Sequence, residues 1–88
     1  MRYDYELCIF GKSKVVHQIA DYFENNHLGF QKSFVLEPTR RKPPKNLDNA
    51  NFYLRVRVTE ENSKILRNYI KLKNQDVKMT YMKISYTS

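Results

Sequence analysis

The segment Asn51–Val58 constrains the fold of this chain more than any other stretch. Apolar and polar side chains alternate along it with a period of two residues, which is the repeat of a β-strand. The apolar positions are Phe52, Leu54, Val56 and Val58, and the positions between them are Tyr53, Arg55 and Arg57. One face of this strand must therefore lie on a core. The other face offers a tyrosine and two guanidinium groups to something outside the core.

The sequence before this segment predicts a strand, a helix and a second strand. Arg2–Phe10 alternates with its odd-numbered residues inward. Gly11-Lys12 predicts a turn and Ser13 a helix cap, before an apolar stripe of helical spacing over Lys14–Asn25. Phe30–Glu37 is rich in aromatic and β-branched residues but alternates poorly, so we interpret it as an edge strand.

The sequence after this segment predicts a helix and a last strand. Thr59 is the expected N-cap of the helix, which ends near Lys73. Val77–Tyr86 is the expected strand, and its pattern leaves the register open. The predicted inward residues of the whole chain are Tyr5, Leu7, Ile9, Val16, Ile19, Phe23, Leu54, Val56, Ile65, Leu66 and Ile70.

The predicted element order is βαββαβ over a single domain, residues 1–88. This is the split βαβ pattern of the ferredoxin-like α+β fold, a four-stranded antiparallel sheet with two helices on one face. Right-handed crossovers then order the strands fourth, first, third and second. On the outer face of the sheet, Glu6, Cys8 and Phe10 are expected beside Tyr53, Arg55 and Arg57.

Positive charge is concentrated in one quarter of the chain. The formal net charge is +7, and residues 38–58 hold six basic groups against Asp48 alone, which is +5 of that total. Pro43-Pro44 keeps the segment around it extended, and no core could hold its cations. Such a footprint favours an anionic partner, most commonly phosphate, although a solvated basic loop is the plainer alternative.

The chemistry-bearing residues argue against an enzyme. Phe10–Lys14 has one glycine and no arginine, so the phosphate-binding loop of acylphosphatases is missing. His17, His27 and the single Cys8 have no metal-ligand spacing, and we expect no catalytic residue, metal or cofactor. An RNA-recognition motif would need more outward aromatics than Phe10 and Tyr53.

Several short motifs resemble the family of ribosomal protein six of bacterial-type small subunits. That family opens Met-Arg-x-Tyr-Glu, as Met1-Arg2 and Tyr5-Glu6 do here with one extra residue between them. It carries an Arg-Arg pair after the second strand, matched by Arg40-Arg41, and then a hairpin of similar length. Its Leu-Ala-Tyr-Pro-Ile segment is replaced here by Lys42-Pro43-Pro44-Lys45. The resemblance spans nearly the whole chain.

The resemblance implies a structural constituent of the small ribosomal subunit that binds ribosomal RNA and a neighbouring protein, which is ribosomal protein eighteen in the family. The short basic sequence favours a mitochondrial ribosome, with a bacterial cytoplasm or a plastid as alternatives. A stand-alone RNA-binding module and a protein–protein adaptor remain alternative functions. Neither a membrane nor a small-molecule substrate is expected as a partner.

The predicted site has two parts. The first is a set of RNA-contacting cations, namely Arg40, Arg41, Lys42, Lys45, Arg55 and Arg57. The second is a protein-contacting pair on the outer sheet face, Tyr53 and Phe10. A solvated polar face is the alternative for this second part.

Overall fold

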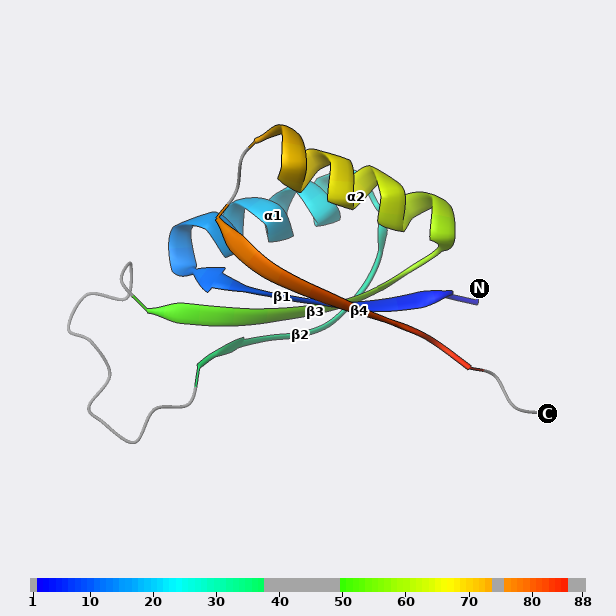
Figure 1. Ribbon diagram of the computed structural model, residues 1–88, viewed down its shortest axis with the longest axis horizontal. Helices are drawn as coiled ribbons and strands as arrows, with labels where there is room; N and C mark the ends of the chain where they lie inside the picture. Colours follow the sequence, from blue (N-terminus) through cyan, green and yellow to red (C-terminus); the bar gives the residue numbers. More distant parts are fainter. Residues whose placement is uncertain (1, 38–49, 74–75, 86–88) are drawn as a thin grey trace.

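A computed structural model describes residues 2–37, 50–73 and 76–85 and contains four strands and two helices. In chain order the elements are β1 (Tyr5–Lys12), α1 (Ser13–Asn25), β2 (Gly29–Leu36), β3 (Asn51–Val58), α2 (Glu60–Leu72) and β4 (Val77–Lys83). The strands form one antiparallel sheet in the order β2-β3-β1-β4, and both helices cover the same face of it (Figure 1). The predicted ferredoxin-like fold and strand order are confirmed, and β2 is an edge strand as expected.

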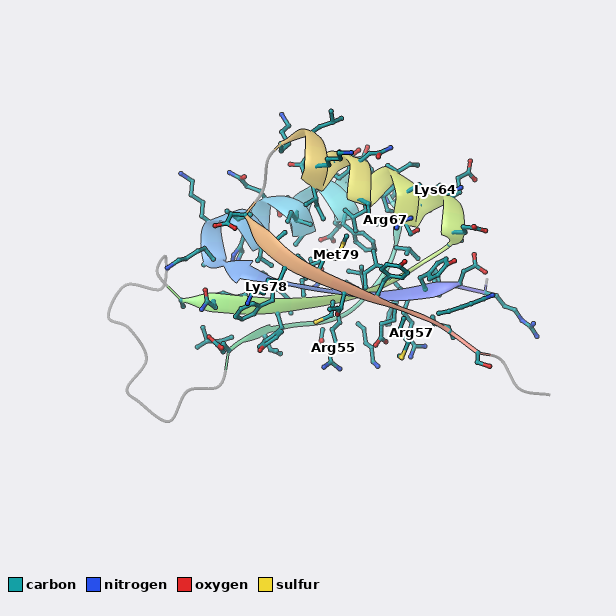
Figure 2. The ribbon with its side chains drawn as sticks, in the orientation of Figure 1. Arg55, Arg57, Lys64, Arg67, Lys78 and Met79 are labelled. Carbon is teal, nitrogen blue, oxygen red and sulfur yellow. The ribbon has the colours of Figure 1, made fainter. Side chains whose placement is uncertain are left out.

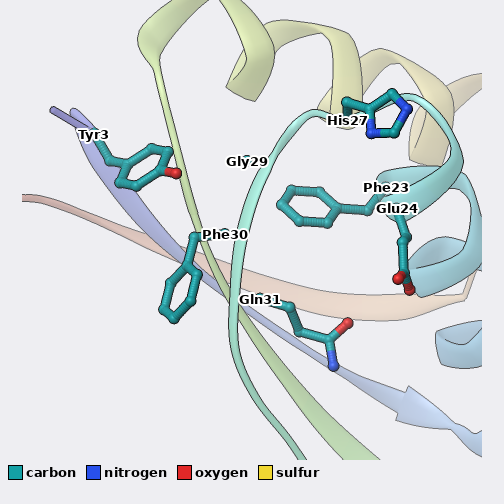
Figure 3. Close-up of a pocket in the computed structure, with 7 residues that line it drawn as sticks. All are labelled: Tyr3, Phe23, Glu24, His27, Gly29, Phe30 and Gln31. Carbon is teal, nitrogen blue, oxygen red and sulfur yellow. The ribbon is translucent and has the colours of Figure 1, made fainter. Parts of the chain in front are cut away.

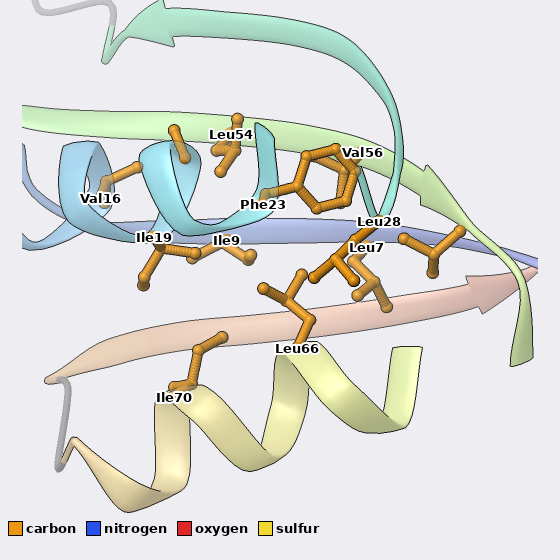
Figure 4. Packing of buried hydrophobic residues seen from close by; sticks show 12 residues of the cluster. Leu7, Ile9, Val16, Ile19, Phe23, Leu28, Leu54, Val56, Leu66 and Ile70 are labelled. Atoms are coloured by element: carbon orange, nitrogen blue, oxygen red, sulfur yellow. The ribbon is translucent and has the colours of Figure 1, made fainter. Parts of the chain in front are cut away.

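The core lies between the sheet and the two helices (Figure 4). In the central pair of strands, Leu7 faces Val56 and Ile9 faces Leu54. Each of these four residues is at most 1% exposed, because the period of two in both strands turns them all toward the helices. The helices contribute the buried residues Val16, Ile19, Phe23, Leu66 and Ile70. All of these were predicted as core from periodicity.

Two members of the predicted core behave differently. Ile65 is 39% exposed, so its assignment to the core was wrong. The inward line of α2 runs through Ser63, Leu66 and Ile70, and Ile65 lies one residue, or about 100°, to the side of it. Tyr5 is only half-buried and packs at the margin of the core. Leu28, which was not predicted, is buried at 5% exposure.

The connection from β1 to α1 is tighter than predicted. β1 starts at Tyr5 rather than at Arg2, and it continues through Gly11 and Lys12, which pair with β3 instead of turning. The N-cap of α1 is Lys12, and it makes no side-chain capping bond. Ser13 is therefore not the cap but the first helical residue, and its backbone N–H donates to the Ala50 carbonyl at 2.9 Å.

The end of α1 is closed by a Schellman motif. The N–H of His27 donates to Glu24, and the N–H of Leu28 donates to Phe23, both at 3.1 Å. Such a motif needs a left-handed residue after the cap, usually glycine, but here His27 takes that place with φ 50°. The buried side chains of Phe23 and Leu28 are both part of the core cluster, as the motif favours.

The start of α2 is capped from two directions. Thr59 Oγ1 accepts from the backbone N–H of Asn62 at 3.2 Å, which confirms the predicted N-cap. Asp4 Oδ2 accepts from the backbone N–H of Glu60 at 2.7 Å, so a carboxylate from the residue before β1 lies at the positive end of the helix dipole. These two caps fix where α2 begins on the sheet.

Candidate interface on the open sheet face

The sheet face opposite the helices, here called the open face, is not covered by any other described element (Figure 1). Figure 2 shows Arg55 and Arg57 projecting on this side, away from α1 and α2. Glu6, Cys8 and Phe10 share this face with Tyr53, Arg55 and Arg57, as predicted, and the register pairs Phe10 with Tyr53, Cys8 with Arg55 and Glu6 with Arg57. From β2 the face receives Phe30 and Val35, and from β4 it receives Lys78, Thr80 and Met82.

Phe10 and Tyr53 are in direct contact on this face. Their ring centroids are 4.6 Å apart and the ring planes meet at 34°. Both residues are half-buried, and they share one row across the sheet with Val35 on β2 and Lys78 on β4. The two predicted interface residues thus form one apolar unit, here called the aromatic plate, with a cation in the same row.

Glu6 binds two cations at the other end of the face. Its Oε1 lies 3.1 Å from Lys32 Nζ and 3.3 Å from Arg57 Nε. The hydrogen bond from Lys32, and that from Arg57, lower the pKa of Glu6 below its ordinary value. Glu6 is therefore held as a carboxylate whose charge is compensated, and Arg57 is already engaged within the chain.

Arg55 differs from Arg57. It is exposed and makes no ion pair or hydrogen bond with another residue in the described part of the chain. It lines a shallow depression of about 470 Å³ together with Glu6, Cys8, Thr80 and Met82. Of the two arginines on the open face, Arg55 is thus the one whose guanidinium has no partner among the described residues.

The open face carries both positive charges and exposed apolar side chains. Lys32, Arg55, Arg57 and Lys78 contribute four positive charges against the one carboxylate of Glu6, an excess of three. Around them, Phe30 is 52% exposed, Val35 49% and Met82 62%. Aromatic residues, methionine and arginine are enriched at protein interfaces, so this composition fits an interface better than it fits a solvated face.

The predicted cluster Arg40, Arg41, Lys42 and Lys45 lies outside the described residues. The two ends of that connection are described, and they are held together because the N–H of Glu37 donates to the Asn51 carbonyl at 2.9 Å. Asn51 is two residues from Tyr53 along β3. The basic connection therefore leaves and rejoins the sheet at the end that carries the aromatic plate.

A second hollow, of about 500 Å³, lies where α1 meets β2 (Figure 3). Its polar lining residues, Glu24, His27 and Gln31, are all exposed, so the hollow does not remove them from water. No three His, Cys, Asp or Glu residues within the described ranges are grouped to hold a metal ion. We assign this hollow no ligand.

Sequence reasoning missed the packing of His17. This residue is exposed, yet its ring centroid lies 4.6 Å from that of Phe34 and 5.2 Å from that of Phe52, both in edge-on contacts. Its Nδ1 lies 2.7 Å from the Ser13 carbonyl, which requires a proton on that nitrogen. The contact packs α1 against β2 and β3, so we interpret it as structural.

No helix in the described ranges has the length and apolarity needed to span a membrane.

The fold and the open face together define a small ferredoxin-like domain with a basic, partly aromatic sheet surface. No protein family model matches the sequence, and no curated protein matches it.

Solved structures share the fold. A PII-like signaling protein from Thermus thermophilus matches with a TM-score of 0.72 and 11% identity, over 92% of this chain and 86% of that one. The nitrogen regulatory PII-like protein CPII from Thiomonas intermedia matches at 0.69 and 14%, over 94% and 90%. The 30S ribosomal protein S6 from Thermotoga maritima matches at 0.59 and 9%, over 94% and 89%. Identities this low show a shared fold alone.

Proposed function

We propose that this protein is a structural, non-enzymatic component of a small ribosomal subunit, in a mitochondrial ribosome, that binds ribosomal RNA and a neighbouring ribosomal protein. The observation that carries the proposal is the open face, where the aromatic plate lies beside Arg55, which has no ion pair or hydrogen bond with another described residue. The motif resemblance to ribosomal protein six supports it. A 30S ribosomal protein S6 is also among the structures that share the fold.

RNA binding is assigned to the basic connection and to the cations near it. Arg40, Arg41, Lys42 and Lys45 form the densest basic cluster of the sequence. Phosphate contacts need only charge and reach, and Arg55 supplies a further free guanidinium. If roughly three to six contacts form, log affinity falls with log salt at a slope of about −2 to −5. Reversing the charges of Arg40 and Arg41 flattens that slope.

The protein contact is assigned to Phe10 and Tyr53. A carboxylate on this face would by itself repel phosphate, but the charge of Glu6 is compensated by its ion pairs with Lys32 and Arg57. The stronger reason is apolar exposure, because Phe30, Val35 and Met82 share the face. RNA phosphates would leave those side chains in water, whereas a packed protein surface would bury them.

Sedimentation tests this function. A tagged copy expressed in its source organism is followed through a sucrose gradient, separately for mitochondrial and cytosolic lysates, at physiological salt. We expect it in the small-subunit fraction of the mitochondrial lysate. Light fractions in both lysates would refute the ribosomal role. If the protein is then found in a light complex that ribonuclease disrupts, it is a stand-alone RNA-binding module. If the light complex resists ribonuclease, the protein is a protein–protein adaptor.

Tyr53→Ala tests the role of the aromatic plate in assembly, with Tyr69→Ala as the matched control. Tyr69 is also half-buried and stacks on an aromatic ring, that of Tyr22 at 3.8 Å, but on the helix side. We expect only the Tyr53 variant to leave the small-subunit fraction while it stays folded by circular dichroism. If both variants are lost from the small-subunit fraction to the same extent, the aromatic plate is not part of the protein interface.

A further inference from the structure

We infer that α2 carries a second binding surface, for the phosphate backbone of RNA, on the side of the molecule away from the open face. Lys64, Arg67 and Lys71 follow one another at spacings of three and four residues, so they share one stripe of the helix. With Asn68 they line a hollow of about 340 Å³. Figure 2 shows Lys64 and Arg67 on α2, opposite Arg55 and Arg57. This inference rests on the proposed RNA-binding role and extends it to a surface outside the predicted site.

No ion pair between described residues engages the stripe. Neither Lys64 nor Lys71 makes one, and the hollow has no carboxylate in its lining. The acidic residues of α2, Glu60 and Glu61, are helical neighbours of Lys64 alone, so Arg67 and Lys71 have no carboxylate of α2 within one turn. Like charges three or four residues apart on a helix repel one another and destabilise it. An external anion would relieve that repulsion.

Arg67 is held in place by β4. Its guanidinium carbon lies 5.3 Å from the ring centroid of Tyr81, which is 59% exposed and meets Tyr5 edge-on. A guanidinium stacked on an aromatic ring keeps its N–H groups free at the edge and loses less freedom when it binds phosphate. The centre of the stripe is therefore preorganised.

The dimensions of the stripe suit a nucleic acid backbone. Lys64 and Lys71 are seven residues apart, which is a rise of about 10 Å along the helix. Each strand of a duplex carries one phosphate per about 3.4 Å of the duplex axis, so cations spread over this length can reach more than one phosphate of a backbone that crosses the stripe. A membrane surface fits less well, because Leu66 and Ile70, the buried apolar residues of α2, already face the core.

The test compares two variants of equal charge. Lys64→Gln/Lys71→Gln removes two cations from the stripe, and Lys14→Gln/Lys83→Gln removes two exposed cations, one on α1 and one at the end of β4. All four lysines lie on the surface, so both variants should remain folded. Binding to a fluorescently labelled RNA duplex of about 20 base pairs is measured by anisotropy across a salt series. We expect the stripe variant to lower the magnitude of the salt slope by about 2 and the control variant to leave it unchanged.

Other outcomes separate this inference from the proposed function. Equal slopes for the two variants, with wild-type binding intact, would refute the α2 surface alone. No binding of the duplex by the wild-type protein would refute both the surface and the RNA-binding role. If vesicles of phosphatidylserine and phosphatidylcholine bind the wild type but not the stripe variant, while duplex binding is unaltered, the surface serves a membrane and the inference is wrong.

Discussion

The position of α2 on the sheet can be tested with two neighbouring substitutions. Leu66 is 0% exposed, whereas Ile65 is 39% exposed. Each side chain loses three carbons when it is replaced by alanine in the same helix. The two variants therefore differ almost only in burial, and a difference in their stability reports which of these residues faces the core.

The expected magnitudes differ clearly. Leu66→Ala removes a fully buried side chain and leaves a cavity, which costs about 2 to 5 kcal/mol. Ile65 is covered over the remaining 61% of its surface (100 minus 39). Full burial of such a side chain contributes about 1.5 to 3 kcal/mol, so Ile65→Ala removes about 1 to 2 kcal/mol of burial. Alanine has a higher helix propensity than isoleucine, which offsets about 0.4 kcal/mol of this loss. Ile65→Ala should therefore lower the free energy of unfolding by about 0.5 to 1.5 kcal/mol.

Urea unfolding followed by circular dichroism gives both free energies. The Leu66 variant should be the less stable of the two by at least about 0.5 kcal/mol, with m-values equal to that of the wild type. Equal losses, or a larger loss for Ile65→Ala, would mean that α2 is rotated by about one residue from the described packing.

Two more predictions concern Glu6 and His27. Folding lowers the pKa of Glu6, so its ion pairs stabilise the fold above the ordinary pKa of a glutamate, and that stability is lost as the pH falls through the folded pKa. Glu6→Gln should therefore lower the free energy of unfolding at about pH 7 and have little effect at about pH 3, while the exposed Glu61→Gln has little effect at either. If Glu6→Gln lowers the free energy of unfolding equally at both pH values, the ion pairs of Glu6 do not stabilise the fold. His27→Gly should raise the free energy of unfolding by about 0.5 to 1 kcal/mol, because φ 50° strains histidine but not glycine, whereas Asn26→Gly, at φ −100°, should lower it. Destabilisation by His27→Gly would contradict this account.

The fold could be predicted from the sequence because two strands alternate without interruption. In β1 and β3 the period of two fixes both the inward residues and the outward residues. The pairing of Phe10 with Tyr53 depends in addition on the register, which alternation alone leaves open by steps of two residues. The poor alternation of β2 also has a physical cause, because a register shift between Gln31 and Ser33 inserts Lys32 as an extra residue. Lys32 then reaches Glu6, a contact that no pattern in the sequence indicated.

The errors arose where two local signals competed. In α2, Ile65 and Leu66 offer two adjacent apolar directions, and only packing against the sheet selects the second. At the start of α1, serine is a common cap, but the pairing of Lys12 with Asn51 extends the strand up to the helix. The cation stripe of α2 could have been found from spacing alone, although the stacking of Arg67 on Tyr81 depends on the placement of β4.

Photo-crosslinking from position 53 tests the central claim most directly. The amino acid p-benzoylphenylalanine replaces Tyr53 in one strain and Tyr69 in another, and small-subunit particles are purified and irradiated. We expect the first replacement to yield a covalent adduct with another ribosomal protein, because Tyr53 stacks on Phe10 on the open face. The second, on the helix side with Tyr22, should yield none to that protein. If particles that contain the position 53 probe form no protein adduct, the open face is not the protein interface and the proposed function loses its main support.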